Sequence, residues 1–226
     1  MTVTFPVLLV LALAPALFWF WFFARQDKHP EPAGLLLRVF VWGMLMVIPA
    51  GLLEQSIDLL LGSTISFILI GVIEEGLKFI AASSIAKNKH FDEPIDGLIY
   101  ATAAALGFAT LENVGYMLKG GADLILVRGP ISTLGHILFS LTWGYAMSLR
   151  RFKGAHNVLR RGWLLGALLH TIFNAVLISS GTPDLEWLVI PFGGMILVMW
   201  RLARRYYASA AQNLEDTVPN QKLLEQ

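Results

Sequence analysis

Apolar residues occur along most of this chain in long runs, separated by short polar segments. About 20 apolar residues in a helix, rising 1.5 Å each, are enough to cross the hydrocarbon core of a bilayer. The runs do not alternate with polar residues, as the strands of a membrane barrel do. The pattern predicts seven membrane-spanning helices, at residues 3–23, 34–53, 64–86, 96–118, 126–149, 162–180 and 185–204.

The polar segments between the runs are short, and they include residues 54–62 and 150–161. No internal repeat and no change of composition marks a second domain. We therefore expect an all-α fold, a polytopic membrane helix bundle over residues 1–208, followed by a polar cytoplasmic tail over residues 209–226.

The composition supports this class. Hydrophobic residues make up 56% of the chain and charged residues 15%, whereas soluble domains carry about a quarter charged residues. The chain has no cysteine, which excludes disulfides, thiolate metal ligands and cysteine nucleophiles. The net charge of +1 offers no argument for a nucleic-acid partner, so the partner that the composition indicates is the lipid bilayer.

Basic residues are distributed unevenly along the chain. The connections after the first, third and fifth predicted spans, together with the chain from Arg201 onward, hold 13 of the 17 Lys and Arg. Basic residues accumulate in the cytoplasmic loops of membrane proteins. The distribution predicts an N-terminus outside the cell and a C-terminus in the cytoplasm.

Ionisable or amide side chains interrupt the apolar runs of the third, fourth, fifth and sixth predicted spans. These are Glu74, Glu75 and Lys78 in the third span, Glu112 and Asn113 in the fourth, His136 in the fifth, and His170 and Asn174 in the sixth. A charged side chain near the bilayer centre costs about 2.5–3.5 kcal/mol on insertion scales. We therefore expect these groups to face the bundle interior and to contact one another.

The depth of these residues in the predicted spans is similar. Counted from the expected outer helix ends at 1.5 Å per residue, five of them lie roughly 9–15 Å below the outer surface. They are Glu74, Glu112, His136, His170 and Asn174. Four helices that place polar groups in one layer indicate a shared site, nearer the outer face of the membrane.

Residue spacing indicates what the site could do. Glu74 and Glu75 point about 100° apart around their helix, so only one faces a reacting centre. Lys78 can pair with either carboxylate and balance its charge. His170 and Asn174 share one helix face and can donate hydrogen bonds to an oxyanion. A glutamate in apolar surroundings can act as a general base on water.

The same residues also have structural interpretations. The glutamates could only form ion pairs with Lys78, and the histidines and Asn174 could only make interhelical hydrogen bonds. We favour the functional interpretation because one lysine can neutralise only one of the two buried glutamates, so the other carboxylate has no counter-charge. We expect Phe108 and Asn113 to lie beside the site, whereas Arg128 fits a snorkelling residue as well as a site residue.

Four motifs occur in order on successive predicted helices, within residues 70–175. They are Glu74-Glu75-x-x-Lys78, Phe108-x-x-x-Glu112-Asn113, His136 and His170-x-x-x-Asn174, and the segment Asp96-Gly97-Leu98-Ile99-Tyr100 precedes the second of them. This set resembles the PrsW family of intramembrane proteases. The resemblance implies a multi-pass endopeptidase of the inner (plasma) membrane, with residues 1–208 as the protease domain. It also implies a single-span membrane protein as substrate, such as an anti-sigma factor, cut near its extracytoplasmic side.

The resemblance also implies roles for individual residues. In the related CAAX-processing endopeptidases, the first glutamate of the pair activates water, a histidine assists, and a His/Asn pair holds the oxyanion. Carried over by motif, Glu74 is the base, while His170 and Asn174 form the oxyanion site. The chain departs from that branch at Glu112, where the branch has histidine, and His136 is a candidate to replace that function.

Metal dependence is a separate question. Glu74, Glu112, His136 and His170 offer oxygen and nitrogen ligands that suit zinc. The chain lacks the His-Glu-x-x-His zinc signature, and several glutamates near one lysine also suit chemistry that needs no ion. We favour a mechanism without a metal or other cofactor, with zinc as the alternative.

Two other classes of protein would also place polar groups in a bundle. A proton- or cation-coupled transporter uses intramembrane Glu and His, but the chain shows no internal repeat and no paired broken helices. A membrane scaffold without activity leaves the shared polar layer unexplained. Cleavage of a membrane substrate would separate a protease from both, and ion flux in liposomes would identify a transporter.

Overall fold

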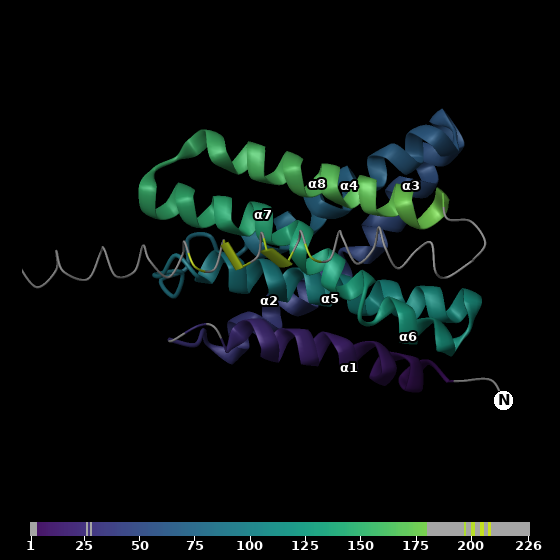
Figure 1. The fold of residues 1–226 in the computed structure, drawn as a ribbon, viewed down its shortest axis with the longest axis horizontal. Coiled ribbons are helices and arrows are strands. Elements are labelled where there is room, and N and C mark those ends of the chain that lie inside the picture. The colour runs from purple at the N-terminus through teal and green to yellow at the C-terminus, as the bar shows by residue number, and fades with distance from the viewer. Residues whose placement is uncertain are drawn as a thin grey trace, which may run out of the picture.

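The computed structural model describes residues 4–25, 27 and 29–179, together with 197, 200, 201, 204, 205 and 208. All regular structure among these residues is helical, as expected (Figure 1). The helices are α1 (Phe5–Ala24), α2 (Ala33–Leu45), α3 (Val47–Leu61), α4 (Ser63–Ser83), α5 (Asp96–Gly120), α6 (Ile125–Arg128), α7 (Ser132–Lys153) and α8 (His156–Ser179), with the short 3-10 helix η1 (Ala122–Leu124) before α6.

Helix α5 is the central helix of the bundle and lies between α7 and α1 (Figure 1). Every residue from 96 to 110 is buried. Small residues allow its neighbours to approach closely: a Cβ atom on Gly107 would lie 1.9 Å from the carbonyl oxygen of Phe40 on α2. Such close backbone contacts are common between helices in membranes, where small residues replace bulky ones at the interface.

The outer surface of the bundle is apolar. Leu60 on α3 is 81% exposed, and Val10 and Leu17 on α1 are also exposed. Among the described helices, α1 and the combined segment Ala33–Leu61 are long and apolar enough to cross a membrane by length and composition alone. Apolar side chains outside and ionisable side chains inside are the arrangement that lipid favours.

The second predicted span differs from the structure. Residues 54–61 were expected in a polar connection, but they continue helix α3, and the chain turns only at Gly62, where φ is 86°. The break falls earlier, at Met46, between α2 and α3. Pro49 explains it, because proline has no N–H to bond the carbonyl of residue 45 and its ring crowds that carbonyl.

Two further boundaries differ from the prediction. The fifth span was expected from residue 126, but α7 begins at Ser132, after Gly129 and Pro130. The connection expected over 150–161 is only two residues long, because α7 continues to Lys153 and α8 starts at His156. Gly154, with φ of 62°, makes the sharp turn between them.

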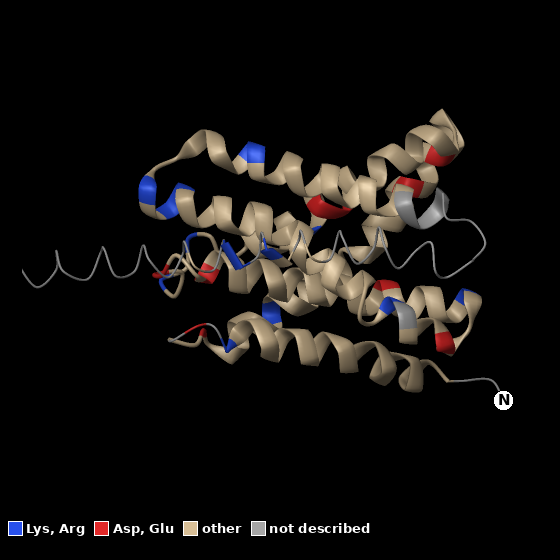
Figure 2. Ribbon diagram, in the orientation of Figure 1, with Lys and Arg blue, Asp and Glu red and all other residues tan. Residues whose placement is uncertain are grey.

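The seventh predicted span and the tail lie outside the described residues, apart from a few single positions. Lys and Arg are concentrated at one end of the described bundle, the left end in Figure 2. The number of spans and the orientation in the membrane stay predictions.

Candidate active site

The polar side chains from four helices meet inside the bundle, as the cost of burying them in lipid led us to expect. Glu75 of α4 contacts His170 of α8, and Glu112 of α5 contacts His136 of α7. Lys78 links the two sets, because its Nζ donates to Glu75 and to Nδ1 of His136. Because α7 begins at Ser132, His136 is the fifth residue of its helix. It therefore lies closer to the start of its helix than predicted, since the predicted span began at residue 126.

Glu75 is the fully buried carboxylate of this cluster, with 0% exposure. Its Oε1 accepts hydrogen bonds from Lys78 Nζ at 2.5 Å and from His170 Nδ1 at 3.0 Å. Its Oε2 accepts from Ser140 Oγ and Trp143 Nε1, both at 2.9 Å. Both oxygens of Glu75 are therefore saturated, and this carboxylate holds two other helices, α7 and α8, against α4.

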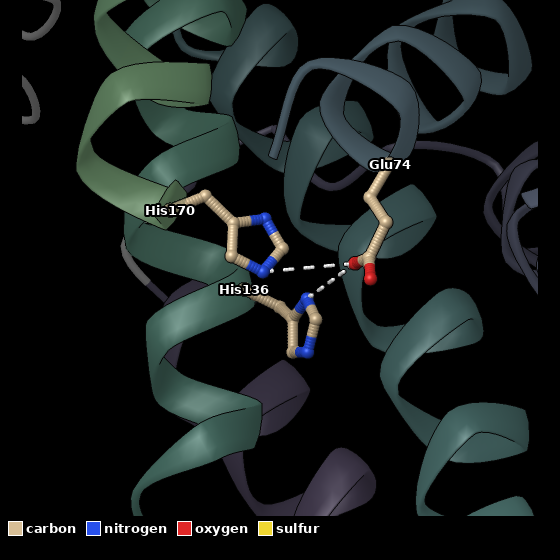
Figure 3. Close-up of side chains that lie close together, drawn as sticks. All are labelled: Glu74, His136 and His170. Atoms are coloured by element: carbon tan, nitrogen blue, oxygen red, sulfur yellow. Dashed lines mark ion pairs between the residues drawn. The ribbon is translucent and has the colours of Figure 1, made fainter. Parts of the chain in front are cut away.

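Glu74, the next residue, has different surroundings. Its Oε2 is buried and accepts no hydrogen bond. Three basic groups surround this oxygen at longer distances: His170 Nε2 at 3.6 Å, Lys78 Nζ at 3.7 Å and His136 Nδ1 at 3.9 Å. Both imidazole rings point toward the carboxylate (Figure 3). An unpaired buried carboxylate oxygen is costly to maintain, and such groups are concentrated at functional sites.

Each histidine has its second nitrogen held by a carboxylate. His170 donates from Nδ1 to Glu75, and the Nε2 of His136 lies 2.9 Å from Glu112 Oε2. If these nitrogens carry the protons, Nε2 of His170 and Nδ1 of His136 keep lone pairs. Those two lone pairs face Glu74.

Arg128 belongs to the site and is not a snorkelling side chain. Its Nη2 donates to Glu112 Oε2 at 2.8 Å, and its Nε donates to Asn113 Oδ1 at 2.9 Å. Its guanidinium lies 3.5 Å from the ring centroid of Tyr116. The Nδ2 of Asn113 also donates to Thr133. Arg128 contacts Glu112 directly, and Asn113 holds Arg128 in place.

A cavity of about 450 Å³ opens onto this cluster. Among the expected site residues, it is lined by Glu74, Glu112, His136, Asn174 and Phe108. Phe108 also lies under Lys78, with Nζ 4.8 Å from the ring centroid. Glu75 and Lys78 do not line the cavity, which makes Glu74 the carboxylate of the pair that a ligand in the cavity can reach.

Sequence reasoning missed Glu54, which lines the cavity from α3. Its Oε1 is buried and has no hydrogen-bond partner. It was assigned to a connection because the polar residues after it were interpreted as a loop. The signal that identifies it is the group of apolar residues at 57 and 59–61, interrupted only by Asp58, which extends the helix past Glu54.

Sequence reasoning also missed Ser140 and Trp143, the two donors to Glu75 from α7. They stand four and seven residues after His136. That spacing places all three side chains on one helix face, so the pattern of polar positions along α7 could have identified them.

The buried residues fit a metal ion. One ligand atom each of Glu74, His136 and His170 lies within 4.8 Å of the others. Two histidines and a glutamate are a known zinc ligand set, and histidine ligands commonly donate their second N–H to a carboxylate. Glu112 was expected among the ligands of a metal-dependent site, but it lies outside this group and supports His136 instead. The Lys78 ammonium, 2.9 Å from His136 Nδ1, opposes a cation there.

The fold and the site together define a class: a helical membrane protein whose Glu, His and Asn side chains face an internal cavity and suit hydrolysis. Residues 31–202 match the sequence pattern of the PrsW family intramembrane metalloproteases. The chain belongs to this family.

Curated relatives agree with this assignment. Protease PrsW of Clostridioides difficile (strain 630) is 31% identical over 212 residues, 86% of this chain and 87% of the relative. Protease PrsW of Oceanobacillus iheyensis is 30% identical over 206 residues, 87% and 95% of the two chains. Protease PrsW of Bacillus subtilis (strain 168) is 28% identical over 213 residues, 89% and 95% of the two chains. No solved structure matches the chain significantly. The family supports a membrane-embedded peptidase and leaves its catalytic type open.

Proposed function

We propose that this chain is a multi-pass endopeptidase of the inner membrane, which cleaves a single-span membrane protein of the anti-sigma-factor type near its extracytoplasmic side. The observation that carries the proposal is the free Oε2 of Glu74, buried between two imidazoles and facing a cavity. A peptide bond and a water molecule both fit a cavity of about 450 Å³.

Glu74 is the general base in this proposal. Lys78 Nζ, 3.7 Å away, favours the ionised carboxylate, which can then accept a proton from water in the cavity. The attacking oxygen forms a tetrahedral centre at the scissile carbonyl, and Glu74 returns the proton to the leaving amine. Glu75 supports this step indirectly, because it holds both Lys78 and His170 in place.

Asn174 is the oxyanion donor in this arrangement. It lines the cavity on the same helix as His170, and an amide N–H can stabilise the charge that develops on the carbonyl oxygen. His170 can join it only as an imidazolium, because Nδ1 already donates to Glu75. In the neutral form, its Nε2 lone pair can accept a hydrogen bond from the water and orient it.

The zinc alternative is supported by the two histidine–carboxylate pairs. Glu74, His136 and His170 would hold the ion. A bound zinc ion would supply Lewis-acid polarisation of the carbonyl and a lowered pKa of water. The chain's own contribution in that case is the orientation of the two imidazoles by Glu75 and Glu112, with Lys78 displaced from His136.

The test is cleavage of tagged single-span membrane proteins by the purified full chain in liposomes, with and without a chelator. Glu74→Gln is the test variant, and Asp58→Asn is the matched control, because Asp58 is exposed and outside the cavity. Cleavage that survives the chelator and Asp58→Asn but not Glu74→Gln supports the glutamate mechanism. Cleavage that the chelator stops and zinc restores supports the metal mechanism.

Other outcomes would contradict the proposal. Full activity of Glu74→Gln would remove Glu74 from the mechanism. Ion flux through liposomes without cleavage of any substrate would favour the transporter that the sequence also allowed.

A further inference from the structure

A second group of carboxylates lies far from the cavity. Glu31, in the connection between α1 and α2, approaches Asp92 and Asp96, which precede and begin α5. One carboxylate oxygen from each lies within 4.8 Å of the others. Asp96 and Glu112 are 16 residues apart on one helix, which corresponds to roughly 24 Å. The acidic residues of these two connections lie together at the left end of the bundle in Figure 2.

Burial makes this group unusual. Asp96 has 0% exposure and Glu31 has 8%. Oδ2 of Asp96 accepts a hydrogen bond from the backbone N–H of Glu93, at 2.6 Å. The other oxygen, Oδ1, is buried and has no partner. A buried carboxylate oxygen without a donor requires a proton or a cation beside it.

Among the residues that the structure describes, no basic side chain forms an ion pair with this group. None of the ion pairs among the described residues includes Glu31, Asp92 or Asp96. Arg151 comes near this end of the bundle, but its guanidinium donates to the backbone carbonyls of Ala86 and Asn88. When ionised, the three carboxylates therefore repel one another, and no basic side chain among the described residues pairs with them.

A buried tyrosine orients one of the three carboxylates. Tyr100 follows Asp96 by one helical turn, and its hydroxyl donates to Oε2 of Glu31. A hydrogen bond that fixes a carboxylate from outside in this way is typical of metal ligands.

We infer that Glu31, Asp92 and Asp96 form a binding site for a hard divalent cation of the Mg²⁺, Mn²⁺ or Ca²⁺ class. Such ions take carboxylate oxygens at 2.0–2.6 Å, so two ligand oxygens lie at most about 5 Å apart. The spacing of this group is within that limit. The ion ties the α1–α2 connection to the start of α5, the helix that carries Glu112 at its other end.

The experiment uses Mn²⁺ as the probe, with the purified full chain in nanodiscs of zwitterionic lipid. Electron paramagnetic resonance counts the bound Mn²⁺, and spin-echo spectra report whether imidazole nitrogen is coordinated. The test variant is Asp92→Asn, because Asp92 is exposed and its loss leaves the packing intact. Asp58→Asn is the matched control, and Glu74→Gln removes the other candidate metal group.

We expect one Mn²⁺ in the wild type, in Asp58→Asn and in Glu74→Gln, without imidazole coupling and displaced by excess Mg²⁺. Asp92→Asn should weaken binding at least tenfold. Mg²⁺ at a hundredfold excess over its Kd should raise the Tm of the Glu74→Gln variant by on the order of 5 °C. The same concentration should leave the Tm of the double variant Asp92→Asn, Glu74→Gln unchanged.

Three results would overturn the inference. One is the absence of bound Mn²⁺ at millimolar concentration, which would mean that the carboxyl groups share protons. Another is unchanged affinity in Asp92→Asn. The third is imidazole coupling that disappears in Glu74→Gln, which would place the ion in the other group. None of these results depends on proteolytic activity, so the proposed function is tested separately.

Discussion

Glu74 and Glu75 are neighbours on one helix, both are buried, and their surroundings are opposite. Glu75 accepts four hydrogen bonds, from Lys78, Ser140, Trp143 and His170. Glu74 faces the cavity with an oxygen that accepts none. One carboxylate is part of the architecture of the bundle, and the other is kept available for a ligand or a proton.

The difference shows how a membrane protein can keep a reactive charge in its interior. The attraction within a buried ion pair offsets the free-energy cost of removing both charges from water only when their remaining polar atoms are hydrogen-bonded. The Glu75–Lys78 pair meets that condition, and Lys78 extends its charge to within 3.7 Å of Glu74. The ammonium of this pair thus offsets part of the cost of charging Glu74.

The sharpest test of this comparison is the loss of each carboxylate charge in turn. Glu74→Gln should lower the cleavage rate by about 10²–10⁴-fold, the usual effect of removing a general base, with little change in Tm. The measurement pairs initial cleavage rates with thermal unfolding of the same preparations. A large fall in Tm for Glu74→Gln would mean that both glutamates are structural.

The second prediction concerns stability. Glu75→Gln should lower the free energy of unfolding by about 3–5 kcal/mol, because it leaves Lys78 buried without its main partner. The double variant Glu75→Gln, Lys78→Met should recover part of that loss, since neither charge remains. Unfolding in a denaturing detergent series would measure the coupling, and strictly additive effects would argue against the pair.

The third prediction tests the helix contact that supports the site. Gly107→Ala should cost about 2–3 kcal/mol or more, because its Cβ would lie 1.9 Å from the Phe40 carbonyl oxygen. Gly115→Ala, on the same helix, meets nothing within 4 Å and should be neutral or stabilising by up to about 1 kcal/mol. Equal Tm values for the two variants would contradict the close packing of α2 on α5.

The smallest effect is expected at Glu54, the second carboxylate with a free oxygen in the cavity. It is on α3, and no basic group forms an ion pair with it among the described residues. We expect Glu54→Gln to change kcat/KM severalfold, on the order of 1 kcal/mol, without a loss of Tm. An effect as large as that of Glu74→Gln would move the base assignment to Glu54.

Much of the site could be predicted from the positions of single residues. Charged side chains in apolar helices must find partners inside the bundle, so the meeting of Glu75, Lys78, Glu112, His136 and His170 followed from the cost of burying them in lipid. Helix ends were less predictable. The break between α2 and α3 depends on Pro49, which lies within an apolar run where hydropathy shows no interruption.

The sequence by itself determined the all-helical membrane class, the family, and the set of polar residues that share the bundle interior. The tertiary structure decided which oxygen stays unpaired, that Arg128 and Glu54 join the cavity, and that a second carboxylate group forms at the other end of α5. The physical reason is that a sequence defines where a side chain stands on its own helix. Its hydrogen-bond partners depend on how the neighbouring helices are rotated and how closely they pack, and those are properties of the assembled bundle.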